Sequence, residues 1–172
     1  MSIGSVYQYF PNKDSILVAL IELHIEQAQE KLLPLSARLI DRREPLVVGL
    51  TELLAAMAEL HRERPNLHRV LFEEAPRPPA LKATLEEIKA DAVNGLVIYL
   101  GTCEEVTLRD IETAALMVVT TIESVTHTIA LGTIDDAEWD VVAVHTVEML
   151  HAYLTRRSAD RIATTRFDAV TY

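Results

Sequence analysis

The first residues of the chain carry side chains that can bond to nucleic acid. In residues 2–10 the apolar side chains recur at helical spacing and form one stripe, which leaves Ser5, Gln8 and Tyr9 on the opposite side. A glutamine amide can bond to base edges in the major groove of DNA, and serine or tyrosine hydroxyls can bond to phosphates. Lys13 follows a Pro-Asn corner in the first turn of the next helix, where acidic residues are usual, which suggests a phosphate contact. The pattern predicts a short DNA-reading helix, a tight corner and a longer helix.

The string SIGSVYQYFPNKDSIL (residues 2–17) resembles the recognition helix and the following helix of the tetracycline-repressor (TetR) family of transcription regulators. The alternative is the amphipathic start of an ordinary helical bundle. The resemblance implies a set of DNA contacts, with Gln8 as the base reader and Gly4 permitting close approach. These contacts are Ser2, Gly4, Ser5, Tyr7, Gln8, Tyr9 and Lys13.

In a helix-turn-helix the recognition helix is held by an earlier helix that packs on it. The family has two further helices in this position, whereas only Met1 precedes Ser2. We therefore expect this chain to lack the first two helices of its DNA-binding domain, through a misplaced start or a truncation.

Composition is that of a soluble globular protein, since 49% of the 172 residues are hydrophobic and 24% are charged. The net charge of −10 argues against a surface that binds nucleic acid throughout, but not against a local DNA-reading tip. Neither a signal peptide nor a membrane span can be recognised, so the expected compartment is the cytoplasm. The single cysteine, Cys103, is better explained as a buried structural thiol than as a redox or metal sensor.

Helical periodicity recurs along the body, so we predict an all-α protein. A connecting helix from Lys13 to about Leu33 is bent or ended by Pro34, and the prolines of residues 75–79 form a loop. Asp135 or Asp136 caps the last long helix. The other helices are expected over residues 45–64, from 81 to Gly101, and over 110–131. The predicted units are a DNA-binding part with its connecting helix (1–33), a ligand-binding and dimerisation domain (34–157) and a partly ordered tail (158–172).

The helix of residues 110–131 is apolar on more than one side, so at least two of its faces must pack against other helices. The family resemblance implies that the last two long helices form a homodimer interface, with two recognition helices about one DNA turn apart. The alternative is a monomer in which these helices complete the core. The expected interface residues are Val118, Ile122, Val125, Ile129, Val142, Thr146 and Leu150.

The resemblance also implies an effector pocket between the middle helices. Aromatic, sulfur-bearing or hydroxyl side chains beside apolar helix faces suggest a small, mainly apolar effector with a few polar anchors. Each candidate by itself is better explained as a plain core residue. His61 and His68, which flank a helix break, are expected to be solvated helix ends. The candidate lining is Met57, His61, Phe72, Tyr99, Thr121 and His127.

Catalytic or metal chemistry is not favoured. Glu148 and His151, with His145 nearby, form a Glu-x-x-His step, but a di-iron bundle needs that step twice and two further glutamates. We expect polar surface or interface pairs there, no bound metal and no cofactor. A phosphate-binding glycine loop, a nucleophile elbow and a Cys-x-x-Cys pair are not recognised, so nothing favours an enzyme on this helical scaffold. The expected function is a ligand-responsive, DNA-binding repressor, and the alternative is a ligand-binding or dimerising module without DNA binding.

Overall fold

The computed structural model describes residues 10–63, 68–70, 76 and 78–156, and every regular element within these ranges is helical. The predicted all-α fold is confirmed there, and no helix of this part is long and apolar enough to cross a membrane. The predictions for residues 1–9 and for the tail at 158–172 lie outside the described residues. The long helices are α2 (Lys13–Arg42), α3 (Leu46–Glu63), α5 (Pro79–Thr102), α6 (Ile111–Ala130) and α7 (Asp136–Thr155).

Helix α2 is much longer than the sequence pattern predicts, because it runs through Pro34 to Arg42. A proline inside a helix removes one backbone hydrogen bond, here the bond to the carbonyl of Glu30. Pro34 and Leu33 are exposed, so solvent can satisfy that carbonyl. Beyond the proline, Leu39 is buried in the core. The prediction that the helix stops near Leu33 is therefore wrong, since packing after the proline outweighs one missing hydrogen bond.

Capping residues place the starts of α2 and α7 where the sequence predicts them. Asn12 caps α2, because its side chain accepts a hydrogen bond from the amide of Ser15 at 2.9 Å and the Ser15 hydroxyl closes a reciprocal capping box. Asp135 caps α7 in the same way, with Glu138 as its partner. These capping residues act within one turn, which is why the sequence alone can identify them.

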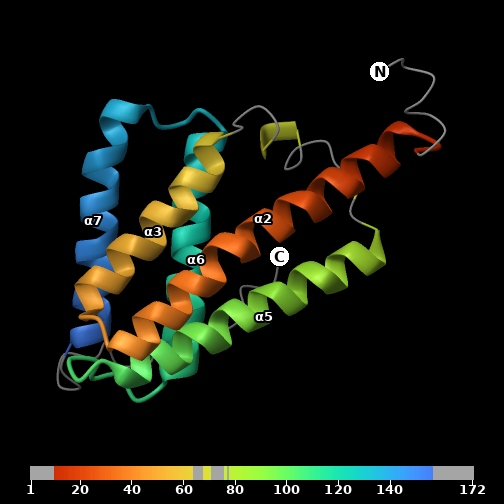
Figure 1. The fold of residues 1–172 in the computed structure, drawn as a ribbon. Helices are drawn as coiled ribbons and strands as arrows, with labels where there is room; N and C mark the ends of the chain where they lie inside the picture. The colour runs from red at the N-terminus through yellow and green to blue at the C-terminus, as the bar shows by residue number, and fades with distance from the viewer. Residues whose placement is uncertain (1–9, 64–67, 71–75, 77, 157–172) are drawn as a thin grey trace, which may run out of the picture.

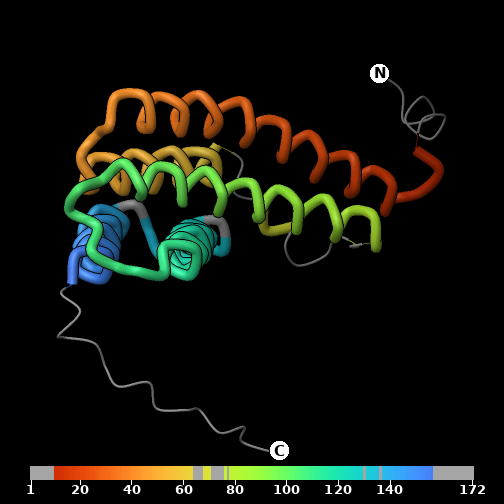
Figure 2. The backbone as a smooth tube through the Cα atoms, turned by 90° about the horizontal axis from the view of Figure 1, so that it is seen from below, coloured from red at the N-terminus to blue at the C-terminus, as the bar shows by residue number. Residues whose placement is uncertain are grey.

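The five long helices pack with α6 and α7 on one side of α2, α3 and α5 (Figures 1 and 2). Helices α2 and α5 lie side by side and run in the same direction, and α3 packs against both α6 and α7. In Figure 2, α6 and α7 are seen end-on, on one side of the other three helices. The N-terminal half of α2 extends with the start of α5 away from α6 and α7.

Two apolar clusters hold this arrangement together. The main core joins all five long helices and includes Leu50 and Leu100. A smaller cluster of Leu17, Ile21 and Leu81 joins the outer halves of α2 and α5. The connecting helix is thus packed at both ends, against the body through one cluster and against the start of α5 through the other.

The turn between α2 and α3 is anchored by α5. The hydroxyl of Tyr99 lies 3.0 Å from the carbonyl oxygens of both Glu44 and Pro45, to which it can donate. Glu105 accepts a hydrogen bond from the first amide of α3, at Leu46, at 2.7 Å. This end of the molecule is therefore tied by polar contacts as well as by the core.

Candidate functional site

The predicted DNA-reading residues fall mostly outside the described part of the chain. Ser2, Gly4, Ser5, Tyr7, Gln8 and Tyr9 lie in residues 1–9, so their contacts remain predictions. Lys13 is described: it is exposed and is the first residue of α2.

Four of the six histidines meet between α2, α3, the helical residues 68–70 and α6. The ring centroid of His68 lies 4.1 Å from that of His24 and 4.5 Å from that of His61. His127 of α6 extends the group, with its ring centroid 4.7 Å from that of His61. We call these four residues the histidine cluster.

Hydrogen bonds determine the protonated nitrogen in two of the rings. Nδ1 of His61 lies 2.7 Å from the carbonyl oxygen of Met57, and Nε2 of His68 lies 3.1 Å from that of Leu60. A carbonyl oxygen only accepts, so each of these nitrogens must carry its proton. A neutral ring then leaves Nε2 of His61 and Nδ1 of His68 without a proton.

Burial disfavours the charged form of these imidazoles. Desolvation is the largest cause lowering the pKa of His68, to about 3, and the nearby His24 and His61 lower it further. Burial also lowers the pKa values of His24 and His61, while the carboxylates of Glu63 and Glu123 act on them in the opposite direction. His24, His61 and His68 are therefore neutral imidazoles at neutral pH.

The cluster corrects one sequence prediction. His61 and His68 were expected to be solvated helix ends, yet each is only 2% exposed. The ring of His68 instead packs against the rings of both His61 and His24. A partial signal was available, because His61 follows Met57 by one turn and His24 follows Ile21 by three residues, on buried helix faces.

The predicted effector lining is only partly brought together. His61 and His127 are in contact, and the backbone carbonyl of Met57 accepts a hydrogen bond from His61. Tyr99 instead lies at the turn between α2 and α3, where its hydroxyl bonds to the backbone. Thr121 is half-buried on α6, and Phe72 lies outside the described residues.

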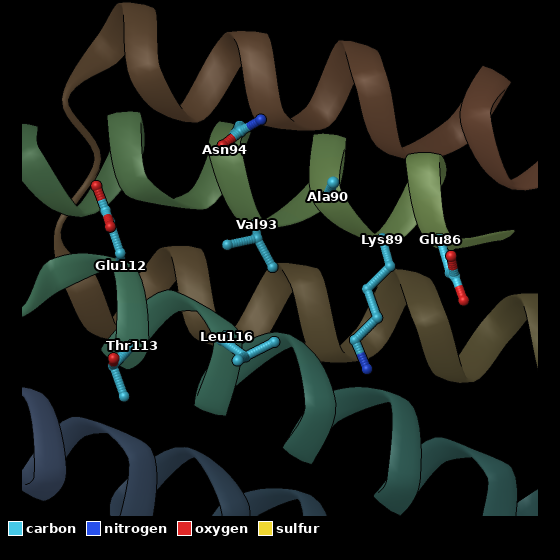
Figure 3. A pocket seen from close by; sticks show the side chains of 8 residues that line it. All are labelled: Glu86, Lys89, Ala90, Val93, Asn94, Glu112, Thr113 and Leu116. Atoms are coloured by element: carbon cyan, nitrogen blue, oxygen red, sulfur yellow. The ribbon is translucent and has the colours of Figure 1, made fainter. Parts of the chain in front are cut away.

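A separate surface groove lies between α5 and α6 and has a volume of about 440 Å³. Figure 3 shows Val93 of α5 and Leu116 of α6 facing one another across it. Glu86 and Lys89, one turn apart on α5, also line the groove. The Lys89 ammonium forms an ion pair with the Glu123 carboxylate at 3.5 Å. The groove is open and does not contain the histidine cluster.

The expected dimer residues divide into two groups. Val118, Ile122, Thr146 and Leu150 are buried within the single chain, so their side chains belong to its own core and have almost no surface to offer a partner. Val125, Ile129 and Val142 are half-buried. Different apolar residues of the same two helices are more than two-fifths exposed: Leu116, Met117, Val141, Val144 and Met149.

The remaining polar candidates form ordinary pairs. His145 lies 3.3 Å from Glu148, whereas His151 lies 3.6 Å from Glu105 of another segment. Cys103 is half-buried rather than fully buried, and burial raises the pKa of its thiol. A raised pKa disfavours the reactive thiolate, in agreement with a structural role.

Comparison with known protein families identifies the body of the chain. A family model described as the tetracyclin repressor-like C-terminal domain matches residues 45–154, which is more than half of the sequence. The match spans α3, α5, α6 and α7. No curated protein sequence matches the chain.

Proposed function

The chain belongs to the tetracyclin repressor-like family, and we propose that it is the ligand-responsive, dimerising part of a transcriptional repressor that binds operator DNA. The observation that carries this proposal is the continuity of α2. One helix joins the segment that resembles a recognition helix to the main core, from Lys13 to Arg42.

This continuity supports a mechanical link between the body and the DNA. A displacement of α2 within the body moves its outer end, because an unbroken helix transmits a rigid-body shift. In the proposed mechanism the effector binds better to a conformation in which the two recognition helices no longer fit successive major grooves. The operator is then released by a population shift.

The effector site is proposed between α2, α3 and α6. His61 and His127 meet there, and His24 connects the same place to α2. A small effector, mainly apolar and held by a few polar anchors, could displace these packed rings and so move α2. The histidine nitrogens provide the hydrogen-bonding groups that such anchors need.

The homodimer is proposed to form through the outer faces of α6 and α7. Exposed apolar side chains on α6, such as Met117, and on α7, such as Val144, supply a surface that water disfavours. Pairing two copies of two antiparallel helices makes a four-helix bundle with two-fold symmetry. That symmetry matches a pseudo-palindromic operator.

The test is fluorescence anisotropy with labelled DNA from the region upstream of the gene. This chain and a version extended at its N-terminus by the upstream in-frame codons are compared, with random DNA as competitor. We expect specific, salt-sensitive binding by the extended protein alone. Failure of both proteins to bind would refute the DNA-binding proposal and favour a ligand-binding or dimerising module without DNA binding.

A further inference from the structure

The histidine cluster connects parts of the chain that are far apart in sequence. His24 comes from α2, His61 from α3, His68 from the short helical stretch and His127 from α6. His24 stands edge-on to His68, with ring planes at 86°, whereas His61 and His68 are tilted by only 31°. Close ring contacts of this kind require that the rings carry little charge, because neighbouring imidazolium ions repel.

The surroundings do not neutralise a charged cluster. Two carboxylates act on it, Glu63 at the end of α3 and Glu123 on α6. Glu123 is already paired with Lys89 of α5, at 3.5 Å. Despite these carboxylates, burial keeps the pKa values of His24, His61 and His68 below the ordinary range, and repulsion from neighbouring histidines lowers those of His24 and His68 further.

We propose that the histidine cluster is a proton-binding site whose protonation separates α2 from α3 and α6. Neutral rings allow the four segments to pack, and a second proton on any ring places a positive charge among buried imidazoles. The chain relieves this charge by moving His24 of α2 toward water, since His24 is only partly buried whereas His61 and His68 are buried.

The expected size of the pH effect follows from the thermodynamic linkage between proton binding and the separation of α2. An imidazole that stays neutral in the packed form and titrates normally in the separated form shifts this equilibrium about tenfold between about pH 7.5 and 5.5. Three such rings shift it by up to about 10³-fold in the same interval. Buried histidine clusters in pH sensors act in the same range.

A metal ion is the competing ligand for four imidazoles. In the described part of the chain, no three His, Cys, Asp or Glu side chains are arranged to hold one. The rings contact each other edge and face instead, and two of them already donate to backbone carbonyls. The experiment below separates the proton from a metal ion directly.

The experiment measures the distance between spin labels on α2 and α3 by pulsed electron paramagnetic resonance. Labels are attached at Glu22→Cys and Ala55→Cys, two exposed positions, in a chain carrying Cys103→Ser. Labelled protein is diluted with unlabelled protein, and samples with a chelator span about pH 7.5 to 5.5. We expect a second, longer distance to grow as pH falls, while circular dichroism shows that the helices remain.

Variants test whether the pH-dependent change in distance arises from the histidine cluster. His24→Gln keeps a side chain of similar length but removes the titrating ring on α2, so the pH response should shrink by about tenfold in the population ratio. The matched control, His145→Gln with His151→Gln, removes the two histidines of α7 outside the cluster and should respond as the parent does. If His24→Gln is too unstable to measure, the titration of the histidine ring protons by NMR in the unlabelled parent provides the same test.

Three results would overturn the proposal: a constant distance over the whole pH range, an equal response in His24→Gln and its parent, or a distance that responds to added Zn²⁺ but not to pH. The inference rests on the proposed function only where it concerns the effect of protonation on operator binding. The distance is measured without DNA, so loss of operator binding with an intact pH response would count against the repressor alone.

Discussion

The ring of Tyr99 fills the space that a β-carbon on Gly49 would occupy. An ideal β-carbon there would overlap the hydroxyl and the adjacent ring carbons of Tyr99. The same hydroxyl lies 3.0 Å from the carbonyl oxygens of Glu44 and Pro45, at the turn that follows α2. The absence of a side chain on α3 thus lets α5 hold the end of the connecting helix.

Gly49→Ala should destabilise the protein, because either Tyr99 or the backbone of α3 must move. Overpacking of this kind costs about 1–3 kcal/mol in the free energy of unfolding. The control is Gly95→Ala on α5, where a β-carbon would meet nothing within 4 Å. That change should stabilise the helix by about 0.5–1 kcal/mol. Urea unfolding measures both, and equal effects of the two substitutions would contradict the proposed fit.

Removing the Tyr99 hydroxyl tests the same contact from the other side. Tyr99→Phe should cost about 1–2 kcal/mol, because the bonds to the α2–α3 turn are lost. In the Gly49→Ala background the same change also removes one overlapping atom, so the double variant should be more stable than the sum of the single effects predicts. Strict additivity in urea unfolding would show that the two residues are independent.

The free energy of unfolding should fall as the solution becomes acidic. The pKa of His68 drops from 6.5 to about 3 on folding, so the unfolded chain binds a proton in this interval that the folded chain does not. Stability is therefore complete above about pH 6.5 and declines below it by up to about 1.4 kcal/mol per pH unit for each such histidine.

Equilibrium unfolding between about pH 5 and 8 measures this slope. His68→Gln retains an amide that can donate to Leu60 and should reduce the slope below pH 6.5, the ordinary value from which the His68 pKa is lowered. An unchanged slope in this variant would contradict the assignment of the effect to His68.

Formation of the proposed homodimer should depend on the exposed face of α7 rather than on the core residues of α6. Val144→Lys places a charge on a side chain that is 56% exposed, so it should weaken the dimer with little effect on folding. Val47→Lys, at a 47% exposed valine of α3, is the matched control. Val118→Ala should instead cost about 1–3 kcal/mol of stability by leaving a cavity.

Sedimentation equilibrium separates these outcomes by giving the mass in solution. We expect a dimer for the parent and for Val47→Lys, and a shift toward monomer for Val144→Lys. A parent that is monomeric at all concentrations would refute the dimer and support the alternative in which α6 and α7 only complete the core.

DNA contacts are tested in the N-terminally extended protein. Gln8→Ala should change which operator sequences are preferred, because a glutamine amide reads base edges. Lys13→Ala should weaken binding to all sequences and lower the salt dependence by about one phosphate contact. Anisotropy titrations at several salt concentrations measure both effects, and equal losses on all DNA for the two variants would exclude this division of roles.

The sequence by itself determined the features that act within a few residues. Asn12 and Asp135 identify helix starts because a cap bonds within one turn. Helical periodicity predicted the all-α class, and the pattern of residues 2–17 led to the family that the match over 45–154 then confirmed.

Only the tertiary structure decided the contacts between distant helices. Pro34 lies inside α2 because burial beyond it outweighs a local hydrogen bond, and local rules cannot weigh that burial. Periodicity marked a buried face of α6 but could not say whether the same chain or a partner covers Val118. The four histidines are spread from position 24 to 127, so only the packing of α2, α3 and α6 brings their rings into contact.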